Sequence, residues 1–248
     1  MKRIAIVIHD DKPHAADAAD EFEKACLACG VETIVVEGNH LPANVDAVIG
    51  VGGDGTVLRA AGLALDGDIP VAGINVGRVG YLAEFGIGEI KMFAEALAAD
   101  KGRVFSAMTV DVEGPGFSAS GINDVVIEKV VSERIIEICV TINGHRFADY
   151  RTDGLIVATP VGSTAYSLSA GGPVVDPEVE ALVLTPVAPH SLLSRSLVVS
   201  RDARIEITLE LDRPARVNVD GRKVGDVEPG QIVQVHRGRR TARFLTLD

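Results

Sequence analysis

Residues 48–56 read VIGVGGDGT, an apolar run that ends in closely spaced glycines with one aspartate, Asp54, among them. Glycines at such positions let backbone amides approach a ligand, as they do in loops that bind phosphate groups. A carboxylate in this loop is unexpected, because it and a phosphate about 4 Å away repel each other by several kcal/mol. The repulsion is offset if Mg²⁺ lies between them, or if the carboxylate deprotonates a hydroxyl group. Both arrangements are typical of phosphoryl transfer.

Two other interpretations of the glycine loop remain open at this point. The pattern G-x-G-x-x-G at residues 50–55 matches a dinucleotide-binding fingerprint, but the acidic residue expected about 20 positions later is missing and Asn75 stands there. Asp54 is also suited to capping a helix that begins at Thr56 or Val57, since Asp is common at that position. A capping role would leave the loop without its reactive group.

Two polar clusters lie further along the chain. The pair Asn123-Asp124 comes just before an apolar run and suits a turn or a cap as well as a binding role. Residues 153–173 hold five Ser or Thr hydroxyls, four glycines and Tyr166, which together provide backbone access, hydrogen-bond donors and an aromatic face. This combination suits a nucleoside with its ribose and phosphates. The alternative is a small-residue turn that feeds a tightly packed helix, because small residues recur there at helical spacing.

The first hundred residues predict an open α/β domain. Short β-branched runs alternate with amphipathic stretches, which is the pattern of a parallel sheet covered by helices on both faces. The predicted strands span residues 3–9, 31–37, 45–51 and 70–76, and the predicted helices span residues 17–30, 56–67 and 87–102. The glycine loop then lies between a strand and a helix, where a phosphate-binding loop is expected.

The second half of the chain predicts antiparallel β structure. The Asn-Gly pair at residues 143–144 is the strongest short signal for a hairpin turn. Residues 205–211 alternate between apolar and polar types, and the Asp-Gly pair at residues 220–221 supplies a further turn. We therefore expect an α/β domain at residues 1–100 and a β-rich domain at residues 101–248, with the chain end free to return to the first domain.

Composition narrows the class of function. Asp and Glu outnumber Lys and Arg by 35 to 24, for a formal charge of −11, so the chain repels nucleic acid and anionic membrane surfaces. No apolar segment approaches the roughly 20 residues needed to span a bilayer, and the start of the sequence lacks a signal-peptide core. We expect a cytoplasmic protein that acts on small molecules. Cys26 and Cys29 share one face of a predicted helix, which favours packing in the core over metal binding.

Taken together, these motifs resemble the NAD kinase family, whose members transfer the γ-phosphate of ATP to the 2′-hydroxyl of the adenosine ribose of NAD. The stretches that carry the resemblance are GGDGT at 52–56, GINVGRVGYL at 73–82, ND at 123–124, TDG at 152–154 continuing to 173, PHSL at 189–192 and DG at 220–221. The GSTAY block joined to DGLI is the most specific of them, because lipid kinases share the GGDGT loop. The likeness spans nearly the whole chain.

The resemblance implies a fold and a set of site residues. It implies an α/β domain followed by a β-rich domain with the active site between them, and Mg²⁺ or another divalent metal bound with ATP. No residue is assigned as a direct metal ligand. Asp54 would be the catalytic base, and the ATP phosphates would contact Gly52, Gly53, Gly55, Thr56 and Arg59. NAD would contact Asp54, Gly55, Tyr81, Asn123, Asp124, Arg151, Asp153, Val161, Thr164, Ala165, Tyr166 and Ser169.

The resemblance also implies a homodimer or homotetramer in which a neighbouring subunit contributes to the NAD pocket. Three positions depart from the family pattern: Val161 removes a hydroxyl near the dinucleotide, Ser196 replaces a usual proline, and Tyr81 replaces the commoner phenylalanine. Two rival functions remain, a lipid kinase that shares the glycine loop and a non-catalytic sensor that binds NAD. The lipid kinase requires an apolar pocket or a basic membrane-facing surface, and the sensor would be expected to lose Asp54.

Overall fold

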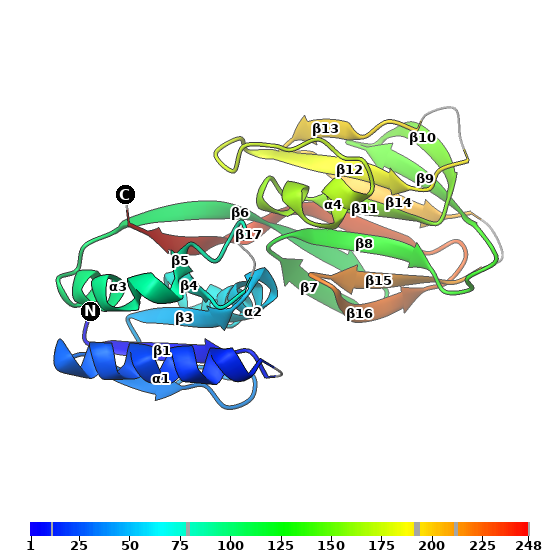
Figure 1. Cartoon of the computed structure of the whole chain (residues 1–248). Helices are drawn as coiled ribbons and strands as arrows, with labels where there is room; N and C mark the ends of the chain where they lie inside the picture. Colours follow the sequence, from blue (N-terminus) through cyan, green and yellow to red (C-terminus); the bar gives the residue numbers. More distant parts are fainter. Residues whose placement is uncertain (11, 78–79, 191–193, 211–212, 248) are drawn as a thin grey trace. The chain divides into compact units, whose positions relative to one another are not determined.

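The computed structural model describes residues 1–10, 12–77, 80–190, 194–210 and 213–247 of the chain, which Figure 1 traces from end to end. The chain divides into two compact units: unit 1 comprises Met1–Ala107 and Arg240–Asp248, and unit 2 comprises Met108–Arg239. Strands β6 (Arg103–Gly114) and β17 (Ile232–Thr246) pair with each other, and each continues from one unit into the other. Five residues named in the sequence motifs lie outside the described residues: Arg78, Val79, Ser191, Leu192 and Leu211.

A parallel sheet forms the centre of unit 1. Its strands lie in the order β2-β1-β3-β4, and each neighbouring pair runs in parallel. The strands are β1 Arg3–Ile8, β2 Glu32–Val35, β3 Ala47–Gly52, β4 Val71–Asn75 and the short β5 Phe85–Gly86, which pairs with β4. The helices are α1 Pro13–Ala28, α2 Asp54–Ala64 and α3 Ile90–Ala98, with 3-10 turns η1 Leu65–Gly67 and η2 Ile87–Glu89.

Apolar packing explains where the helices of unit 1 lie. Helices α1 and α3 share one core with the sheet, and the rings of Phe22 and Phe93 stack within it at a centroid distance of 5.7 Å. Helix α2 packs on β3 and β4, where Gly50 and Gly73 lie so close to Val57 that a Cβ on either would approach it within 3.0 Å or less. The glycines of β3 and β4 therefore bring the start of α2 against the carboxyl ends of the strands.

Unit 2 is a sandwich of two β-sheets that bury one continuous apolar core between them. One sheet has the antiparallel order β13-β12-β11-β8-β15-β16, and the other contains the antiparallel neighbours β10-β9-β14-β17. The strands are β7 Phe117–Gly121, β8 Asp124–Lys129, β9 Ile136–Ile142, β10 His145–Thr152, β11 Gly154–Ala158, β12 Ala181–Val187, β13 Leu197–Ser200, β14 Ile205–Leu209, β15 Ala215–Val219 and β16 Arg222–Val227.

The outer face of the first of these sheets carries a second, smaller apolar cluster. Val126, Ile156, Ala158 and Val183 form it, and Ala170 and Val175 pack against it from the chain that follows β11. That chain contains the 3-10 turn η3 Val161–Thr164 and the single-turn helix α4 Tyr166–Ser169. The polar segment at residues 159–173 is therefore attached to a sheet face through its small apolar residues.

The fold class predicted from the sequence is confirmed: a mostly parallel α/β unit and an antiparallel β-rich unit are present. The hairpin between β9 and β10 turns at Asn143 and Gly144, whose φ angles of 51° and 79° are those that a type I′ turn requires. Cys26 is fully buried, and burial, followed by the nearby Cys29 and Glu23, raises the pKa of its thiol to about 12. The helix suggested by the spacing of small residues after Tyr166 is only one turn long.

Candidate active site

Asp54 is the first residue of α2, and its carboxylate turns away from its own helix. Oδ2 accepts a hydrogen bond from the backbone amide of Tyr81 at 2.9 Å, and Oδ1 accepts from the amides of Leu82 at 3.1 Å and Ala83 at 3.2 Å. Gly53 occupies the N-cap of α2, and no side chain caps the helix. The capping interpretation of Asp54 is therefore wrong. The carboxylate instead ties the glycine loop to the segment that follows β4.

The glycines around Asp54 divide into two kinds. A Cβ on Gly52 would lie 2.2 Å from Thr56 Oγ1, and a Cβ on Gly80 would lie 2.1 Å from Asp54 Oδ1, so both positions are filled by close packing. A Cβ on Gly53 would have only the Lys12 ammonium near it, at 3.8 Å, and one on Gly55 would have nothing within 4 Å. Open space for a ligand therefore lies beside residues 53 and 55.

A hollow of about 410 Å³ opens at this end of α2. It is lined by His9, Asp10, Lys12, Gly53, Asp54, Gly55, Thr56 and Arg59. The Arg59 guanidinium already has two partners in the protein. It lies 3.2 Å from Asp10 Oδ2, and it donates a hydrogen bond to the carbonyl oxygen of Gly38 at 3.2 Å. Gly53, Asp54, Gly55, Thr56 and Arg59, which the sequence assigned to the ATP phosphates and the base, are thus brought together in unit 1.

The pair Asn123-Asp124 in unit 2 is held by a distant aspartate. The Asp220 carboxylate accepts hydrogen bonds from the backbone amides of Ile122 at 2.8 Å, Asn123 at 2.8 Å and Asp124 at 3.2 Å. The amide of Asp220 in turn donates to the carbonyl oxygen of Asp124 at 3.1 Å. On the other side, Gly162 approaches Asn123 so closely that a Cβ would lie 1.9 Å from its carbonyl oxygen. This backbone is fixed from both sides.

The polar groups of these two side chains are in unusual surroundings. Asp124 is 4% exposed, and its burial, together with the neighbouring Asp220 charge, raises the pKa of its carboxyl to about 7. Asn123 Oδ1 is buried and makes no hydrogen bond in the described part of the protein. An acceptor without a donor costs about 1–3 kcal/mol in a folded protein. A ligand that donates a hydrogen bond there would recover that cost.

Hydroxyl groups link the polar segment to the sheet beneath it. Ser167 Oγ and Thr185 Oγ1 lie 2.9 Å apart, and Thr185 Oγ1 donates to Ser196 Oγ at 3.1 Å. Gly172 packs over the same hydroxyls, since a Cβ there would lie 2.3 Å from Ser167 Oγ. Ser196, where the family usually has proline, therefore supplies a polar contact that proline would lack.

A second hollow, of about 320 Å³, brings Asp153 and Tyr166 together in unit 2. Lys129 Nζ lies 2.6 Å from Asp153 Oδ1, so the cation neutralises one carboxylate of this hollow. Burial, with the charges of Glu128, Asp153 and Asp124, raises the pKa of the Tyr166 hydroxyl. Among the other predicted NAD contacts, Val161, Thr164, Ala165 and Ser169 lie on the same segment as Tyr166. Neither hollow is lined by Tyr81 or Arg151.

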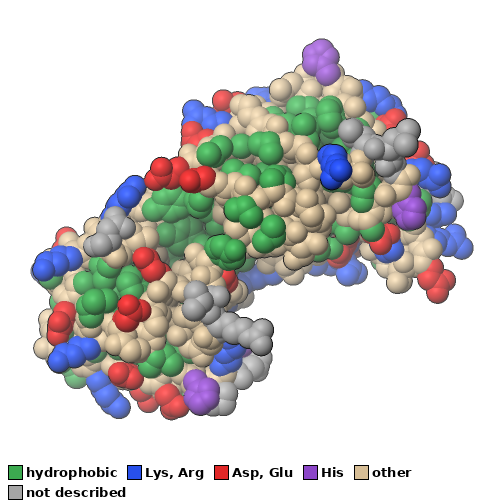
Figure 2. Space-filling model, turned by 45° about the horizontal axis from the view of Figure 1, so that its top comes forward, with side chains coloured by type: hydrophobic (Ala, Val, Ile, Leu, Met, Phe, Trp, Pro, Cys, Tyr) green, Lys and Arg blue, Asp and Glu red, His purple; other side chains and the backbone are tan. Residues whose placement is uncertain are grey.

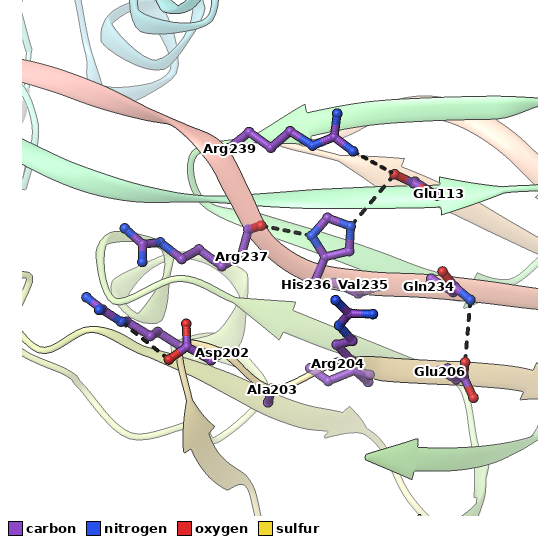
Figure 3. A pocket seen from close by; sticks show the side chains of 12 residues that line it. Glu113, Asp202, Ala203, Arg204, Glu206, Gln234, Val235, His236, Arg237 and Arg239 are labelled. Atoms are coloured by element: carbon purple, nitrogen blue, oxygen red, sulfur yellow. Dashed lines mark hydrogen bonds and ion pairs between the residues drawn. The ribbon is translucent and has the colours of Figure 1, made fainter. Parts of the chain in front are cut away.

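A larger hollow of about 590 Å³ lies elsewhere in unit 2, beside β14 and β17 (Figure 3). None of the predicted site residues lines it. Three of its four arginines face carboxylates: Arg201 and Arg237 pair with Glu180, which lies outside the lining, and Arg239 lies 3.8 Å from Glu113. The positive charge of this hollow is therefore largely balanced within the protein, and it is not a strong anion site.

The sequence did not single out several residues that the structure brings to the two sites. Lys12 and His9 line the hollow beside Asp54, and Lys129 pairs with Asp153. Asp220 was recognised as a turn residue and a family match, but not as the acceptor of three amides. Within the described residues, no cluster of at least three His, Cys, Asp or Glu side chains is arranged to hold a metal ion.

Comparison with known proteins places both units in one family. The ATP-NAD kinase N-terminal domain matches residues 32–101, and the ATP-NAD kinase C-terminal domain matches residues 122–247. An NAD kinase of Lachnoclostridium phytofermentans is 34% identical to the chain, over 100% of this chain and 95% of the relative. An NAD kinase of Heliobacterium modesticaldum is 35% identical, over 100% of this chain and 94% of the relative.

Solved structures agree with these relatives. The crystal structure of an NAD kinase from Archaeoglobus fulgidus in complex with ATP has a TM-score of 0.84 and 29% identity, covering 100% of this chain and 94% of that one. Yeast NADH kinase complexed with NADH has a TM-score of 0.90 at 22% identity, covering 100% of this chain and 84% of that one, and supports the fold alone.

A carboxylate in a glycine loop at a helix start, with a polar nucleoside-type segment in a β-rich unit, is the arrangement of a small-molecule kinase. The chain belongs to the NAD kinase family, and its activity is that of an ATP-dependent NAD kinase. The family prediction made from the sequence motifs is confirmed. No helix in the described ranges has the length and apolar character needed to cross a bilayer.

Proposed function

We propose that the protein transfers the γ-phosphate of ATP to the 2′-hydroxyl of the adenosine ribose of NAD, with Asp54 as the general base. The observation that carries this assignment is the position of the Asp54 carboxylate. It lines the hollow at the start of α2 and is oriented by three backbone amides. An acid held in this way beside open glycine backbone is suited to a hydroxyl group on one side and a phosphate on the other.

The hydrogen bonds of Asp54 indicate which oxygen takes the proton. An ionised carboxylate offers about four lone-pair positions. Oδ1 already accepts from the amides of Leu82 and Ala83, whereas Oδ2 accepts only from Tyr81. The remaining acceptor position therefore lies on Oδ2. In the proposed step the 2′-oxygen forms a bond to the γ-phosphorus, the bond to the β-phosphate oxygen breaks, ADP leaves, and the proton moves to Oδ2.

The donor side of the reaction requires a divalent metal. The hollow offers the Asp54 and Asp10 carboxylates and open space, which fits an ion whose other ligands are phosphate oxygens and water. Mg²⁺ bound with ATP reduces the negative charge of the donor phosphates. Gly53 and Gly55 let the phosphates approach the start of α2, where the helix dipole favours an anion.

The acceptor side is assigned to unit 2. The orphaned Oδ1 of Asn123 and the carboxyl of Asp124, whose pKa burial raises to about 7, are suited to hydroxyl and amino groups of the adenosine. Thr164, Ala165, Tyr166 and Ser169 would line the adenine and ribose pocket, and Asp153 would lie at the nicotinamide end. Tyr81, Arg151 and Val161 complete the proposed NAD contacts, with Tyr81 73% exposed and so available to cover a bound ligand.

Two broader features belong to the same proposal, a cytoplasmic location and a homodimer or homotetramer. Apolar side chains gather on the face of the molecule seen in Figure 2, and unit 2 exposes several large ones, among them Val174, Val179 and Val198. Exposed apolar surface of this kind is typical of a subunit interface. Light scattering on the purified protein measures the subunit number. A monomer at all concentrations would contradict the proposed homodimer or homotetramer.

The proposed reaction is tested with purified protein, ATP, Mg²⁺ and NAD. We expect NADP to form, and an NADP-specific dehydrogenase coupled to the reaction detects it. Repeating the assay with other divalent metals, with diacylglycerol or sphingosine as acceptor, and without ATP separates the rival functions. A lipid product without NADP would favour the lipid kinase, and NAD binding without any product across these metals would favour a sensor.

A further inference from the structure

Apart from Lys12, the donor hollow contains more negative than available positive charge. Asp54 and Asp10 both line it, and the Arg59 guanidinium is engaged by Asp10 and by the carbonyl oxygen of Gly38. The start of α2 contributes the equivalent of only about half a positive charge. The terminal phosphate of ATP therefore needs a further cation from the protein, besides the metal that accompanies it.

Lys12 is the residue placed to supply that cation. It lies between β1 and α1, at the N-cap of α1, and it lines the hollow with Asp54. Its Nζ would be 3.8 Å from a Cβ on Gly53 and 3.6 Å from a Cβ on Gly77. The ammonium therefore lies beside two glycines. Because glycine has no side chain, the space next to the ammonium is open. In the part of the chain that the structure describes, no ion pair engages it.

The two glycine segments that flank the ammonium are tied together. The amide of Val76 donates to the carbonyl oxygen of Gly52 at 3.0 Å, and the amide of Gly77 donates to Asn75 Oδ1 at 2.8 Å. The two glycines beside Lys12 therefore follow the carboxyl ends of β3 and β4, which are neighbours in the sheet. A phosphate placed against residue 53 would lie within reach of the ammonium.

We propose that Lys12 binds the terminal phosphate of ATP and stabilises the charge that develops on it during transfer, an inference that rests on the function proposed above. An ammonium is a compact charge with three N–H donors, which suits a phosphate whose oxygens change position during the reaction. Lys12 would offset the repulsion between the Asp54 carboxylate and the donor phosphates. Because charge is spread over the three oxygens of the transferred phosphoryl group in the transition state, Lys12 affects turnover as well as ATP binding.

The test compares Lys12→Met with Lys12→Arg and with Lys24→Met, which removes the same charge from an exposed position further along α1. We expect Lys12→Met to lower kcat/KM for ATP by about 10²-fold, with KM for NAD changed by no more than about two-fold. Lys12→Arg keeps the charge and should recover activity to within about ten-fold of the wild type. Lys24→Met should match the wild type.

A binding measurement without turnover gives a second readout. Calorimetry with inorganic tripolyphosphate and Mg²⁺ should give an affinity at least about ten-fold weaker for Lys12→Met than for the wild type, and unchanged for Lys24→Met. Unchanged kinetics and affinity in Lys12→Met, beside an active wild type, would overturn the role of Lys12. An equal loss toward ATP and NAD, with no recovery in Lys12→Arg, would also overturn it. If the wild type itself makes no NADP, the proposed function fails instead.

Discussion

In each unit of the protein, one aspartate accepts hydrogen bonds from three consecutive backbone amides. Asp54 in unit 1 accepts from residues 81–83, and Asp220 in unit 2 accepts from residues 122–124. The geometry of the two is similar, but their surroundings differ. Asp54 is half-buried and lines an open hollow. Asp220 lies in the turn between β15 and β16, and burial raises the pKa of its carboxyl although the three amides lower it.

The same kind of hydrogen bond therefore serves a different purpose in each unit. At Asp220 the carboxylate serves to fix the backbone of residues 122–124, which include Asn123 and Asp124, two of the residues proposed to bind NAD. At Asp54 the amides fix the carboxylate itself, and one acceptor position on Oδ2 stays open toward the hollow. The Asp220 carboxylate is a positioning group, and the Asp54 carboxylate, which lines the open hollow, is suited to chemistry. Four predictions test this distinction.

The largest effect is expected for Asp54→Asn. The amide is close in shape to the carboxylate but cannot take a proton, so turnover should fall at least ~10²-fold while NAD affinity stays within a few-fold. Steady-state assays for NADP formation and calorimetric titration with NAD measure the two quantities. Equal losses of NAD binding and turnover would place Asp54 with Asp220 as a structural group.

Asp220→Ala should act mainly on stability. It leaves the amides of residues 122–124 without their acceptor, which we expect to lower the free energy of unfolding by roughly 2–4 kcal/mol. Urea unfolding measures the change. Asp226→Ala in the same hairpin is the control, because it removes only an exposed ion pair with Lys223, worth about 0–1 kcal/mol. Similar values for the two variants would mean that Asp220 fixes nothing.

Gly80→Ala should disturb the Asp54 carboxylate without removing it. The added Cβ would lie 2.1 Å from Oδ1, so either the carboxylate or the backbone at residue 80 must move. We expect turnover to fall about ten-fold, because a small displacement of a catalytic group is costly. Gly88→Ala, where a Cβ meets nothing within 4 Å, is the matched control. Full activity in Gly80→Ala would show that the position of the carboxylate is not critical.

The smallest effect is expected in the pH dependence of stability that comes from the buried carboxyl of Asp124. The pKa of Asp124 is raised to about 7 by burial and by Asp220. Its contribution to stability is therefore full below the unfolded-state pKa of about 4 and is lost as the pH rises through about 7. Asp124→Asn should reduce the difference between the urea midpoints measured at about pH 5 and about pH 8. An unchanged difference would place the titration on another group.

The sequence predicted the elements of the fold better than the contacts of the site. Runs such as RIAIVI and the Asn-Gly pair at residues 143–144 encode strands and a turn locally, so periodicity and turn chemistry were sufficient. The amide acceptors are long-range: Asp220 bonds to Ile122 at a separation of 98 residues, and Asp54 bonds to Tyr81 at 27. Spacing carries no signal for such contacts, and Asp54 therefore looked equally suited to capping its own helix.

Lys12 was missed for a related reason. A single lysine after β1 has no motif around it, and its relation to Gly53 and Gly77 depends on three strands lying side by side in the order β1-β3-β4. The family motifs, by contrast, identified the polar segment of unit 2 without any geometry. Resemblance thus supplied the candidate residues, whose roles stay predictions, and the geometry was needed to show which backbone amides their carboxylates bind.

The path of β17 has a consequence for the synthesis of the protein. Residues 240–248 belong to unit 1, where Phe244 pairs with Val71 and Leu245 enters the core. These residues follow unit 2 in the chain, so every residue of unit 2 is made before them. The nascent chain can therefore complete unit 2 first, while unit 1 waits for its last strand to be made, the reverse of the usual order.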